Sequence, residues 1–278
     1  MTNKFFKNIL LTVTSAALCC CSVDKKGETS TADSGYATSV LAFDTVGHIF
    51  SDTLNPQFMY TYNLTLPNEG ISPCADSIRL SMIEEATGVR TNDILSAREK
   101  KIASLAVMDE EDVVAYREMF SPKETPCVFE CTADKVFENA DIYNSVFTAY
   151  SYMGGAHGYY YADFKIWDKV NAKRLSLEDI FVDDSKSKLT EMILDTLCRM
   201  MDVKGHENLT DAGIPDVKDV APNNSMIVYD DSLSFNYKPY EIACYAVGPI
   251  EVKFSFSDLK PLMKTDSPLY KLADKDKE

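Results

Sequence analysis

The sequence is poor in the residues on which most catalytic and metal sites depend. Among its 278 residues it has three histidines, and none belongs to an HExxH motif or accompanies cysteines at metal-binding spacing. A Gly-x-Ser-x-Gly elbow is absent, as is a phosphate-binding glycine loop followed by Lys-Ser or Lys-Thr. The sequence therefore predicts no metal and no cofactor, nominates no catalytic residue and favours a binding role over an enzymatic one.

Basic residues are also scarce. The chain has 28 Lys and Arg against 43 Asp and Glu, which gives a formal net charge of -15. Such a surface repels nucleic acid and anionic lipid, because both usually bind through a basic patch. No nucleic acid partner is expected. The charge favours a basic protein partner, although it also serves to keep many acidic proteins soluble.

The N-terminal apolar run is too short to cross a bilayer. Ile9–Leu18 has ten mostly apolar residues, whereas a transmembrane helix needs about 20. Two lysines and no acid precede this run, and Cys19–Cys21 follow it directly. This order is typical of a lipoprotein signal peptide over residues 1–20. The alternative is a cleaved secretory signal with incidental cysteines.

Cys21 is the predicted lipid attachment site. The signal peptidase for lipoproteins requires a branched apolar residue three positions before the acceptor, and Leu18 favours Cys21 over Cys20. Cleavage removes two lysines and no acid, so the formal net charge changes from -15 to -17. Residues 21–38 are predicted to form a flexible tether. We expect an extracytoplasmic protein of the cell envelope, periplasmic or on the outer membrane or surface, whose only membrane contact is acyl chains such as palmitate.

The remaining cysteines do not predict a disulfide framework. Their number is odd, so at least one has no intramolecular partner. Cys127 and Cys131 lie in a predicted strand, where four residues separate Cα atoms by roughly 13 Å. A disulfide needs less than about 7 Å. Buried thiols are therefore expected for the five cysteines, Cys74, Cys127, Cys131, Cys198 and Cys244.

Hydrophobic periodicity predicts an α+β fold with antiparallel sheets, helices packed on one side and two intimately associated subdomains. The chain is predicted to be extended from Val40 to Leu66, with clear alternation over 58–66. The other predicted strands are 127–131, 134–138, 142–152, 159–167, 226–229, 232–237 and 251–256, with a short strand and turn in 173–181. The predicted helices are 74–86, with Gly88 as its stop, two within 92–120 joined near Met108, and a short one capped by Ser257. A further helix, capped by Ser185 and ending near Met201, is predicted to turn its apolar side inward, with Leu189, Met192, Ile193, Leu197 and Met200.

The predicted subdomains are residues 39–140 and 141–264. A charged tail, 265–278, is expected to be frayed.

The most distinctive segment is Tyr150–Tyr161, in which glycines and a histidine separate two tyrosine-rich strands. Glycine permits close backbone approach, and tyrosine supplies rigid contact area with a polar tip. One interpretation is a recognition loop. Its ligand-binding candidates are Tyr152, Gly154, Gly155, His157, Gly158 and Tyr159. The alternative is a tight hairpin whose histidine bonds to the backbone and whose tyrosines belong half to the core.

Three segments together resemble the RsiV-like C-terminal domain family (DUF3298 type): Tyr150–Gly158, Leu175–Phe181 and Phe235–Gly248. The family's usual Gly-Lys before the second segment is Ala172-Lys173 here. The region Phe43–Tyr150 resembles the PdaC-type domain (DUF4163 type) that usually precedes it. In the last segment, the Pro239-Tyr240 corner is expected to order the sheet, because proline fixes φ and the adjacent aromatic packs.

The resemblance implies a binding role at the cell envelope. A characterised relative, an anti-sigma factor, binds lysozyme with this ectodomain, while a deacetylase relative carries a separate catalytic domain that this sequence lacks. We therefore expect a non-catalytic, lipid-anchored protein whose partner is a lysozyme-like or other basic envelope protein, or a peptidoglycan fragment. The alternative is an enzyme that acts on peptidoglycan or another envelope glycan.

Overall fold

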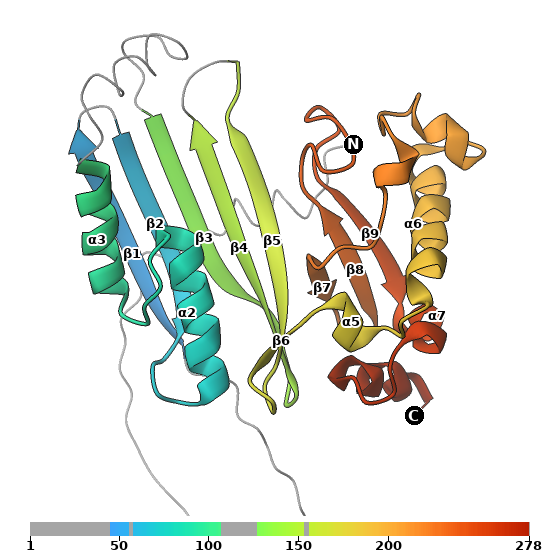
Figure 1. Ribbon diagram of the computed structural model, residues 1–278, viewed down its shortest axis with the longest axis horizontal. Helices are drawn as coiled ribbons and strands as arrows, with labels where there is room; N and C mark the ends of the chain where they lie inside the picture. The colour runs from blue at the N-terminus through green and yellow to red at the C-terminus, as the bar shows by residue number, and fades with distance from the viewer. Residues whose placement is uncertain (1–44, 56–57, 107–126, 153–155, 278) are drawn as a thin grey trace, which may run out of the picture. The chain divides into compact units, whose positions relative to one another are not determined.

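A six-stranded sheet contains the first six strands of the described chain. The computed structural model describes residues 45–55, 58–106, 127–152 and 156–277. The strands follow one another across the sheet in chain order (Figure 1): β1 (Thr45–Asn55), β2 (Phe58–Pro67), β3 (Cys127–Glu138), β4 (Ile142–Tyr152), β5 (Tyr159–Asp168) and β6 (Lys173–Leu175).

All neighbours in this sheet are antiparallel except β2 and β3, which run parallel. Parallel neighbours cannot be joined by a hairpin, and the chain between them includes helices α2 (Pro73–Thr87) and α3 (Ile94–Ala106). Both helices cover the same face of the sheet (Figure 1). The predicted α+β class, with mainly antiparallel sheets and helices on one side, is confirmed.

Two residues set the ends of α2. Ser72 has an extended backbone, and its Oγ accepts a hydrogen bond from the N–H of Ala75 at 3.1 Å. At the other end, Gly88 takes a left-handed φ of 74°, and its N–H donates to the carbonyl of Glu84 at 2.7 Å. The predicted helix, with Gly88 as its stop, is confirmed.

The second sheet has three antiparallel strands, β7 (Met226–Val228), β8 (Ser232–Tyr237) and β9 (Ile250–Ser255). Helix α6 (Ser185–Met201) packs Leu189, Ile193 and Leu197 into the core that it shares with these strands. The shorter helices of this part are α5 (Leu177–Ile180), η2 (His206–Leu209), η3 (Val217–Asp219), α7 (Phe256–Leu259), η4 (Lys260–Leu262) and η5 (Pro268–Lys277).

A buried asparagine joins the two sheets. The Nδ2 of Asn144 on β4 donates to the carbonyl of Met226 at 3.2 Å, and its Oδ1 accepts from the N–H of Val228 at 2.9 Å. On β5, the N–H of Phe164 donates to the Oγ of Ser225 at 3.1 Å. These bonds satisfy buried polar groups, and they hold the segment before β7 against β5, where the candidate site lies.

Two predicted helix caps are wrong. The cap of α6 is Asp184, because Ser185 already lies inside the helix and is buried. The cap of α7 is Ser255, whose Oγ accepts from the N–H of Asp258 at 3.1 Å. An N-cap needs non-helical backbone; Ser255 is extended (φ -65°, ψ 151°), whereas Ser257 lies within the helix.

The C-terminal segment is not frayed, contrary to the prediction. It forms η5, and Leu269, Leu272 and Ala273 are buried in the same core as α6 and β9. A spacing of three to four residues puts apolar side chains on one face of a tight helix. The prediction gave weight to the charges between these residues and overlooked the apolar stripe.

Two smaller predictions also need correction. Met200 is 53% exposed instead of facing inward, because α6 buries the side that carries Leu194 and Cys198. The segment after β6 forms helix α5 where a turn was expected. There the carboxylate of Asp179 accepts hydrogen bonds from the N–H and the Oγ of Ser176, both at 2.9 Å, which completes a capping box.

Several predictions fall on residues outside the described part of the chain. These are the signal peptide, the tether and the helix expected after Met108. The predicted boundary between residues 140 and 141 falls in the turn from β3 to β4, across which the sheet continues. No helix in the described ranges has the length and apolar character needed to cross a membrane.

Of the described thiols, all free, those of Cys74 and Cys198 are buried as expected, whereas that of Cys244 is exposed.

Candidate functional site

The predicted ligand-binding residues lie at one end of the β4–β5 hairpin. Tyr152 is the last residue of β4 and is half-buried, and Tyr159 is the first residue of β5 and is 37% exposed. Gly154 and Gly155 lie outside the described residues. The hairpin itself is confirmed, with β4 and β5 paired from Ile142↔Asp168 to Ser151↔Tyr159.

Gly158 permits a close approach between the two strands of this hairpin. It is buried, and a Cβ at this position would lie 2.4 Å from the Cε2 and the Oη of Tyr150. The tyrosine ring therefore lies directly over the glycine backbone. Gly158 therefore fulfils the close backbone approach that was expected of these glycines.

His157 connects the hairpin to a distant segment of the chain. Its Nδ1–H donates to the carbonyl of Gly158 at 2.9 Å, which is the backbone bond expected of a tight hairpin. The imidazole also stacks on the ring of Tyr245, with centroids 4.0 Å apart and planes at 10°. This stack is not visible in the sequence, because Tyr245 belongs to the segment between β8 and β9.

Further rings extend this contact into what we call the aromatic surface, made of His157, Tyr159, Tyr160, Tyr240 and Tyr245. The ring centroids of Tyr240 lie 5.6 Å from those of Tyr245 and 6.4 Å from those of Tyr159, and Tyr160 meets Tyr245 edge-on at 6.1 Å. These separations are those at which aromatic pairs attract one another. Two segments that are far apart in sequence thus build one surface.

Tyr240 does not pack as the sequence analysis expected. Pro239 is buried, but the side chain of Tyr240 is 59% exposed and its backbone has a left-handed φ of 70°. The turn is held by hydrogen bonds from the N–H of Tyr240 to the carbonyl of Ala243 at 3.0 Å and from the N–H of Lys238 to the Oε2 of Glu241 at 2.9 Å. A non-glycine residue in this conformation costs about 1–3 kcal/mol and is typical of functional sites.

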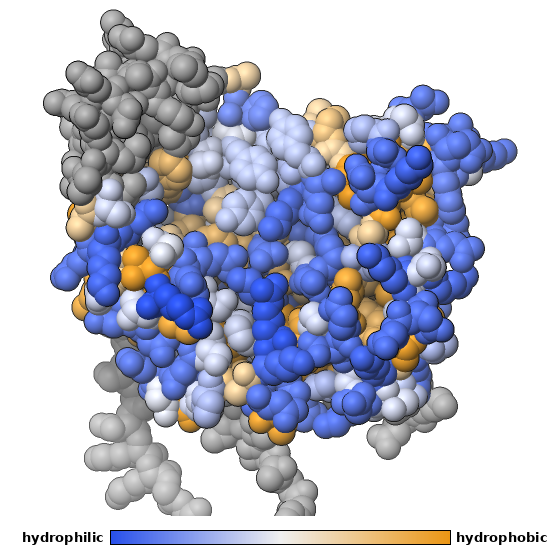
Figure 2. All heavy atoms as spheres, viewed as in Figure 1, coloured by the Kyte–Doolittle hydropathy of each residue, from blue (hydrophilic) through white to orange (hydrophobic). Residues whose placement is uncertain are grey.

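A groove of about 410 Å³ adjoins the aromatic surface and shares Tyr159 and Tyr240 with it. This volume is in the range of small-molecule sites, about 300–1,000 Å³. The groove is lined by Tyr159, Asp163, Arg174, Asn223, Asn224, Ser225, Lys238, Pro239, Tyr240 and Glu241. Figure 2 shows mainly hydrophilic side chains over the molecular face in view, with hydrophobic residues in small separate patches.

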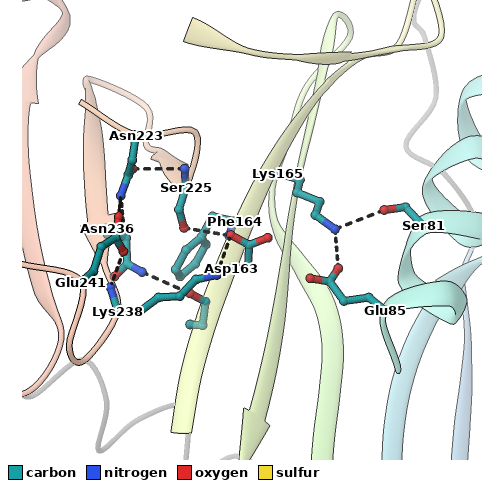
Figure 3. Close-up of polar contacts among 11 residues, drawn as sticks. Ser81, Glu85, Asp163, Phe164, Lys165, Asn223, Ser225, Asn236, Lys238 and Glu241 are labelled. Atoms are coloured by element: carbon teal, nitrogen blue, oxygen red, sulfur yellow. Dashed lines mark hydrogen bonds and ion pairs between the residues drawn. The ribbon is translucent and has the colours of Figure 1, made fainter. Parts of the chain in front are cut away.

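Hydrogen bonds between β5 and the opposite wall hold the groove in shape (Figure 3). Asn223 is central, because its Nδ2 donates to the carbonyl of Asn236 at 2.9 Å and to the Oε1 of Glu241 at 2.7 Å. Asn236 in turn donates from Nδ2 to the carbonyl of Ala162 on β5 at 3.3 Å. The wall that carries Tyr240 is therefore fixed before any ligand arrives.

The lining cations differ in their partners. The Nζ of Lys238 lies 3.5 Å from the Oδ1 of Asp163 and 4.9 Å from the ring centroid of Tyr161 (Figure 3). Arg174 is exposed and makes no hydrogen bond or ion pair with any residue in the described ranges. A guanidinium group in this state presents its donors to solvent or to a ligand.

The phenols of Tyr245 and Tyr160 are protonated at neutral pH. Burial raises the pKa of Tyr245, with smaller contributions from Tyr150 and Tyr240, and burial also raises the pKa of Tyr160. Both hydroxyls are therefore hydrogen-bond donors as well as acceptors. Across the described part of the chain, no three His, Cys, Asp or Glu side chains are grouped so as to hold a metal ion.

Comparisons with known proteins agree with this fold. Residues 178–257 match the family model described as "Protein of unknown function (DUF3298)". A DUF3298 family member from Bacteroides fragilis has a similar structure, with a TM-score of 0.72 and 24% identity over 85% of this chain and 98% of that chain. A DUF3298 family protein from Pseudomonas aeruginosa has a TM-score of 0.57 and 12% identity over 81% of this chain and 96% of that chain. No curated protein matches the sequence.

The resemblance to DUF3298 proteins is thus confirmed for residues 178–257 and for the fold. The matched region contains β7, β8 and the segment that carries Tyr240 and Tyr245. The sequence analysis found the hairpin side of the aromatic surface but missed the groove. Two sequence signals for the groove were Tyr159, which was predicted as a ligand-binding residue, and the Pro239-Tyr240 pair, which was assigned to packing.

Proposed function

We propose that this chain is a non-catalytic, lipid-anchored protein of the cell envelope that binds a protein or cell-wall ligand through the aromatic surface, with a lysozyme-like hydrolase as the first candidate. The observation that carries the proposal is the convergence of His157 and Tyr159 with Tyr240 and Tyr245 at the molecular surface. Tyrosine side chains supply large contact area at low entropic cost, and they are enriched among the residues that dominate binding energies.

The charge of the chain supports a basic partner. The formal net charge is -15 for the full sequence and -17 without the predicted signal peptide. Lysozyme-like hydrolases are often basic, and opposite net charges accelerate association at low ionic strength. Charge alone does not provide specificity, so the aromatic surface is the part that selects the ligand in this proposal.

The proposal includes two finer assignments. Cys21 carries the lipid, supported by the ten-residue apolar run and the three cysteines that end it. Residues 39–140 form a domain of the PdaC-like type (DUF4163), supported by the resemblance of Phe43–Tyr150 to that domain. Mass spectrometry of the protein purified from membranes tests the first point: a lipid-modified N-terminal cysteine is expected, and an unmodified N-terminus contradicts it.

The binding proposal is tested by titrating residues 27–278 with a lysozyme at low and at near-physiological ionic strength. Saturable binding that survives near-physiological salt is expected, because specific contacts are screened less than long-range attraction. His157→Ala should weaken it, whereas His206→Ala should not, because His206 hydrogen-bonds to Asp195 on the helical side of the small sheet. Binding that disappears with salt, or that is the same in both variants, contradicts the proposal. Binding to soluble peptidoglycan fragments in place of lysozyme would identify the cell wall as the ligand.

A second candidate is an enzyme that acts on peptidoglycan or another envelope glycan, and one observation favours it. Burial, and to a smaller extent the charge of Asp163, raise the pKa of Glu85, although its ion pair with Lys165 acts in the opposite direction (Figure 3). A raised carboxyl pKa suits a general acid. Turnover of purified peptidoglycan with a bell-shaped pH profile that Glu85→Gln abolishes would support this candidate; absence of product would exclude it.

A further inference from the structure

The groove contains a cation that no carboxylate in the described ranges pairs with directly, although the charge of Arg174 slightly lowers the pKa of Glu85. Lys238 is occupied by Asp163 and by the face of Tyr161. Arg174, on the short strand β6, lines the same groove without a hydrogen-bond or ion-pair partner in the described ranges. Its guanidinium fork matches the geometry of a carboxylate better than a lysine ammonium does.

The groove also has neutral hydrogen-bonding groups beside this cation. The Oδ1 of Asn224 accepts from the N–H of Leu177 at 2.8 Å, which orients the amide. Its Nδ2 makes no hydrogen bond within the described ranges, and the residue is exposed. A ligand with several hydroxyl groups would use such donors, whereas a purely apolar ligand would leave them without partners.

Two aromatic rings complete the lining. Tyr159 and Tyr240 are 37% and 59% exposed, and their planes differ by 23° with centroids 6.4 Å apart. Neighbouring rings at a shallow angle offer the C–H face of a sugar ring an apolar platform with polar tips. The left-handed backbone of Tyr240 is held by the Glu241 and Asn223 bonds, so this ring is positioned in advance.

We propose that the groove binds an acidic saccharide, meaning a sugar ring that carries a carboxylate. The carboxylate pairs with Arg174, the ring face lies against Tyr240 and Tyr159, and hydroxyls bond to Asn224. The inference deepens the binding role proposed above and rests on it. In this inference the groove binds a small glycan, whereas in the function proposed above the whole aromatic surface binds a protein or cell-wall ligand.

The test uses residues 27–278, labelled with ¹⁵N, and titrates them by NMR with matched pairs of sugars. Glucuronic acid is compared with glucose, and N-acetylmuramic acid with N-acetylglucosamine. The acidic member of at least one pair should bind about tenfold more tightly or better, because hydrogen bonds between a guanidinium and a carboxylate are about twice as strong as those between neutral groups. The pair that shows the preference distinguishes a uronic acid from a cell-wall sugar.

Arg174→Gln should abolish the preference for the acidic sugar while leaving binding of the neutral sugar unchanged. Arg174→Lys should restore part of it, since the charge remains and the fork is lost. Arg199→Gln is the matched control, because Arg199 lies on α6 and its guanidinium bonds to Thr196. Because Arg174 is exposed, all variants should fold with unchanged melting temperatures.

Equal affinity for acidic and neutral sugars overturns the inference, as does a preference that persists in Arg174→Gln or no binding of any sugar. The lysozyme titration on the same preparation separates this failure from failure of the binding role. Lysozyme binding without sugar binding overturns the groove assignment alone. Loss of both overturns the proposed function as well.

Discussion

The imidazole of His157 lies flat against the ring of Tyr245, with centroids 4.0 Å apart and planes 10° apart. Each residue lies in a connecting segment, His157 between β4 and β5 and Tyr245 between β8 and β9. The stack therefore makes one surface of two loops that belong to different sheets. Loops of this kind commonly carry function on a rigid scaffold.

A double-mutant cycle measures this contact. His157→Ala, Tyr245→Ala and the double variant should show a coupling of about 0.5–1.5 kcal/mol in the free energy of unfolding, the value typical of aromatic pairs. Chemical denaturation of the four proteins provides the numbers. Additive effects within experimental error would show that the stack does not stabilise the fold.

The side chain of Tyr240 should strengthen ligand binding, whereas its left-handed backbone conformation should lower the stability of the fold. Tyr240→Gly removes the left-handed strain at φ 70° and is expected to stabilise the fold by about 1 kcal/mol. Tyr240→Ala keeps a Cβ and should bring no such gain. Both variants lose the exposed ring and should bind ligand more weakly. A Gly variant that is less stable than the Ala variant contradicts the strain argument.

Asn144 should be essential for joining the sheets. Asn144→Ala leaves the carbonyl of Met226 and the N–H of Val228 without their buried partner. The expected loss is about 1–3 kcal/mol in the free energy of unfolding for each group left unsatisfied. Asn208→Ala serves as the control, because the half-buried Asn208 donates only to the carbonyl of Lys204 at a solvent-exposed site, where water can replace it. It should change stability by less than about 1 kcal/mol. Equal melting temperatures for the two variants would contradict the role.

Acid should weaken the capping box at α5. Burial alone would raise the pKa of Asp179, but hydrogen bonds from Lys173 and Ser176 prevail and hold that pKa below its ordinary value of 3.8. A lowered carboxyl pKa stabilises the fold above the unfolded value and ceases to do so as the pH falls through the folded value. Asp179→Asn should therefore destabilise the protein at neutral pH by about 0.5–2 kcal/mol, with a smaller effect below pH 3.8.

Unfolding curves at several pH values check this expectation. Asp266→Asn is the control, since Asp266 is exposed and should show no such trend. If the free energy of unfolding of Asp179→Asn differs from that of the unaltered protein by the same amount at every pH, the predicted pH dependence is wrong.

The thiols should differ in reactivity. Burial raises the pKa of Cys74 to about 11 and that of Cys131 to about 12, so both stay protonated at pH 8, where alkylating reagents attack thiolates. Cys244 is exposed and should react first. The experiment uses protein in which Cys127 is replaced by Ser. Mass spectrometry after brief alkylation should then show one modified cysteine, and this modification should be absent when Cys244→Ser is added. Modification of Cys74 before denaturation would contradict the burial.

Local features of the fold were predictable from the sequence. The Ser72 and Gly88 ends of α2, the β4–β5 hairpin and the β7–β8 hairpin follow from side-chain spacing and turn residues that act over a few positions. The errors arose where local signals compete. Two serines near the start of α7 both suit a cap, and only the backbone conformation of the chain leaving β9 selects Ser255.

The candidate site was predictable in part. The glycines and tyrosines around His157 identify the hairpin, because their composition is unusual over a short stretch. Arg174 and Asn224 have no such signal, since single polar residues of these types are common on any surface. Their role depends on which segments the sheets bring to the same groove.

By itself, therefore, the sequence determined the mixed class of the fold, most of its strands and helices, the DUF3298 resemblance and one half of the aromatic surface. The fold class and the elements depend on periodicity and turn chemistry, which are properties of neighbouring residues, whereas the resemblance rests on three segments that match the family's pattern. Only the tertiary structure decided that β2 and β3 pair in parallel, that Leu269 and Leu272 are buried, and that Tyr245 lies between His157 and Tyr240, in ring contact with both. Those outcomes depend on contacts between distant segments, whose partners a local pattern does not specify.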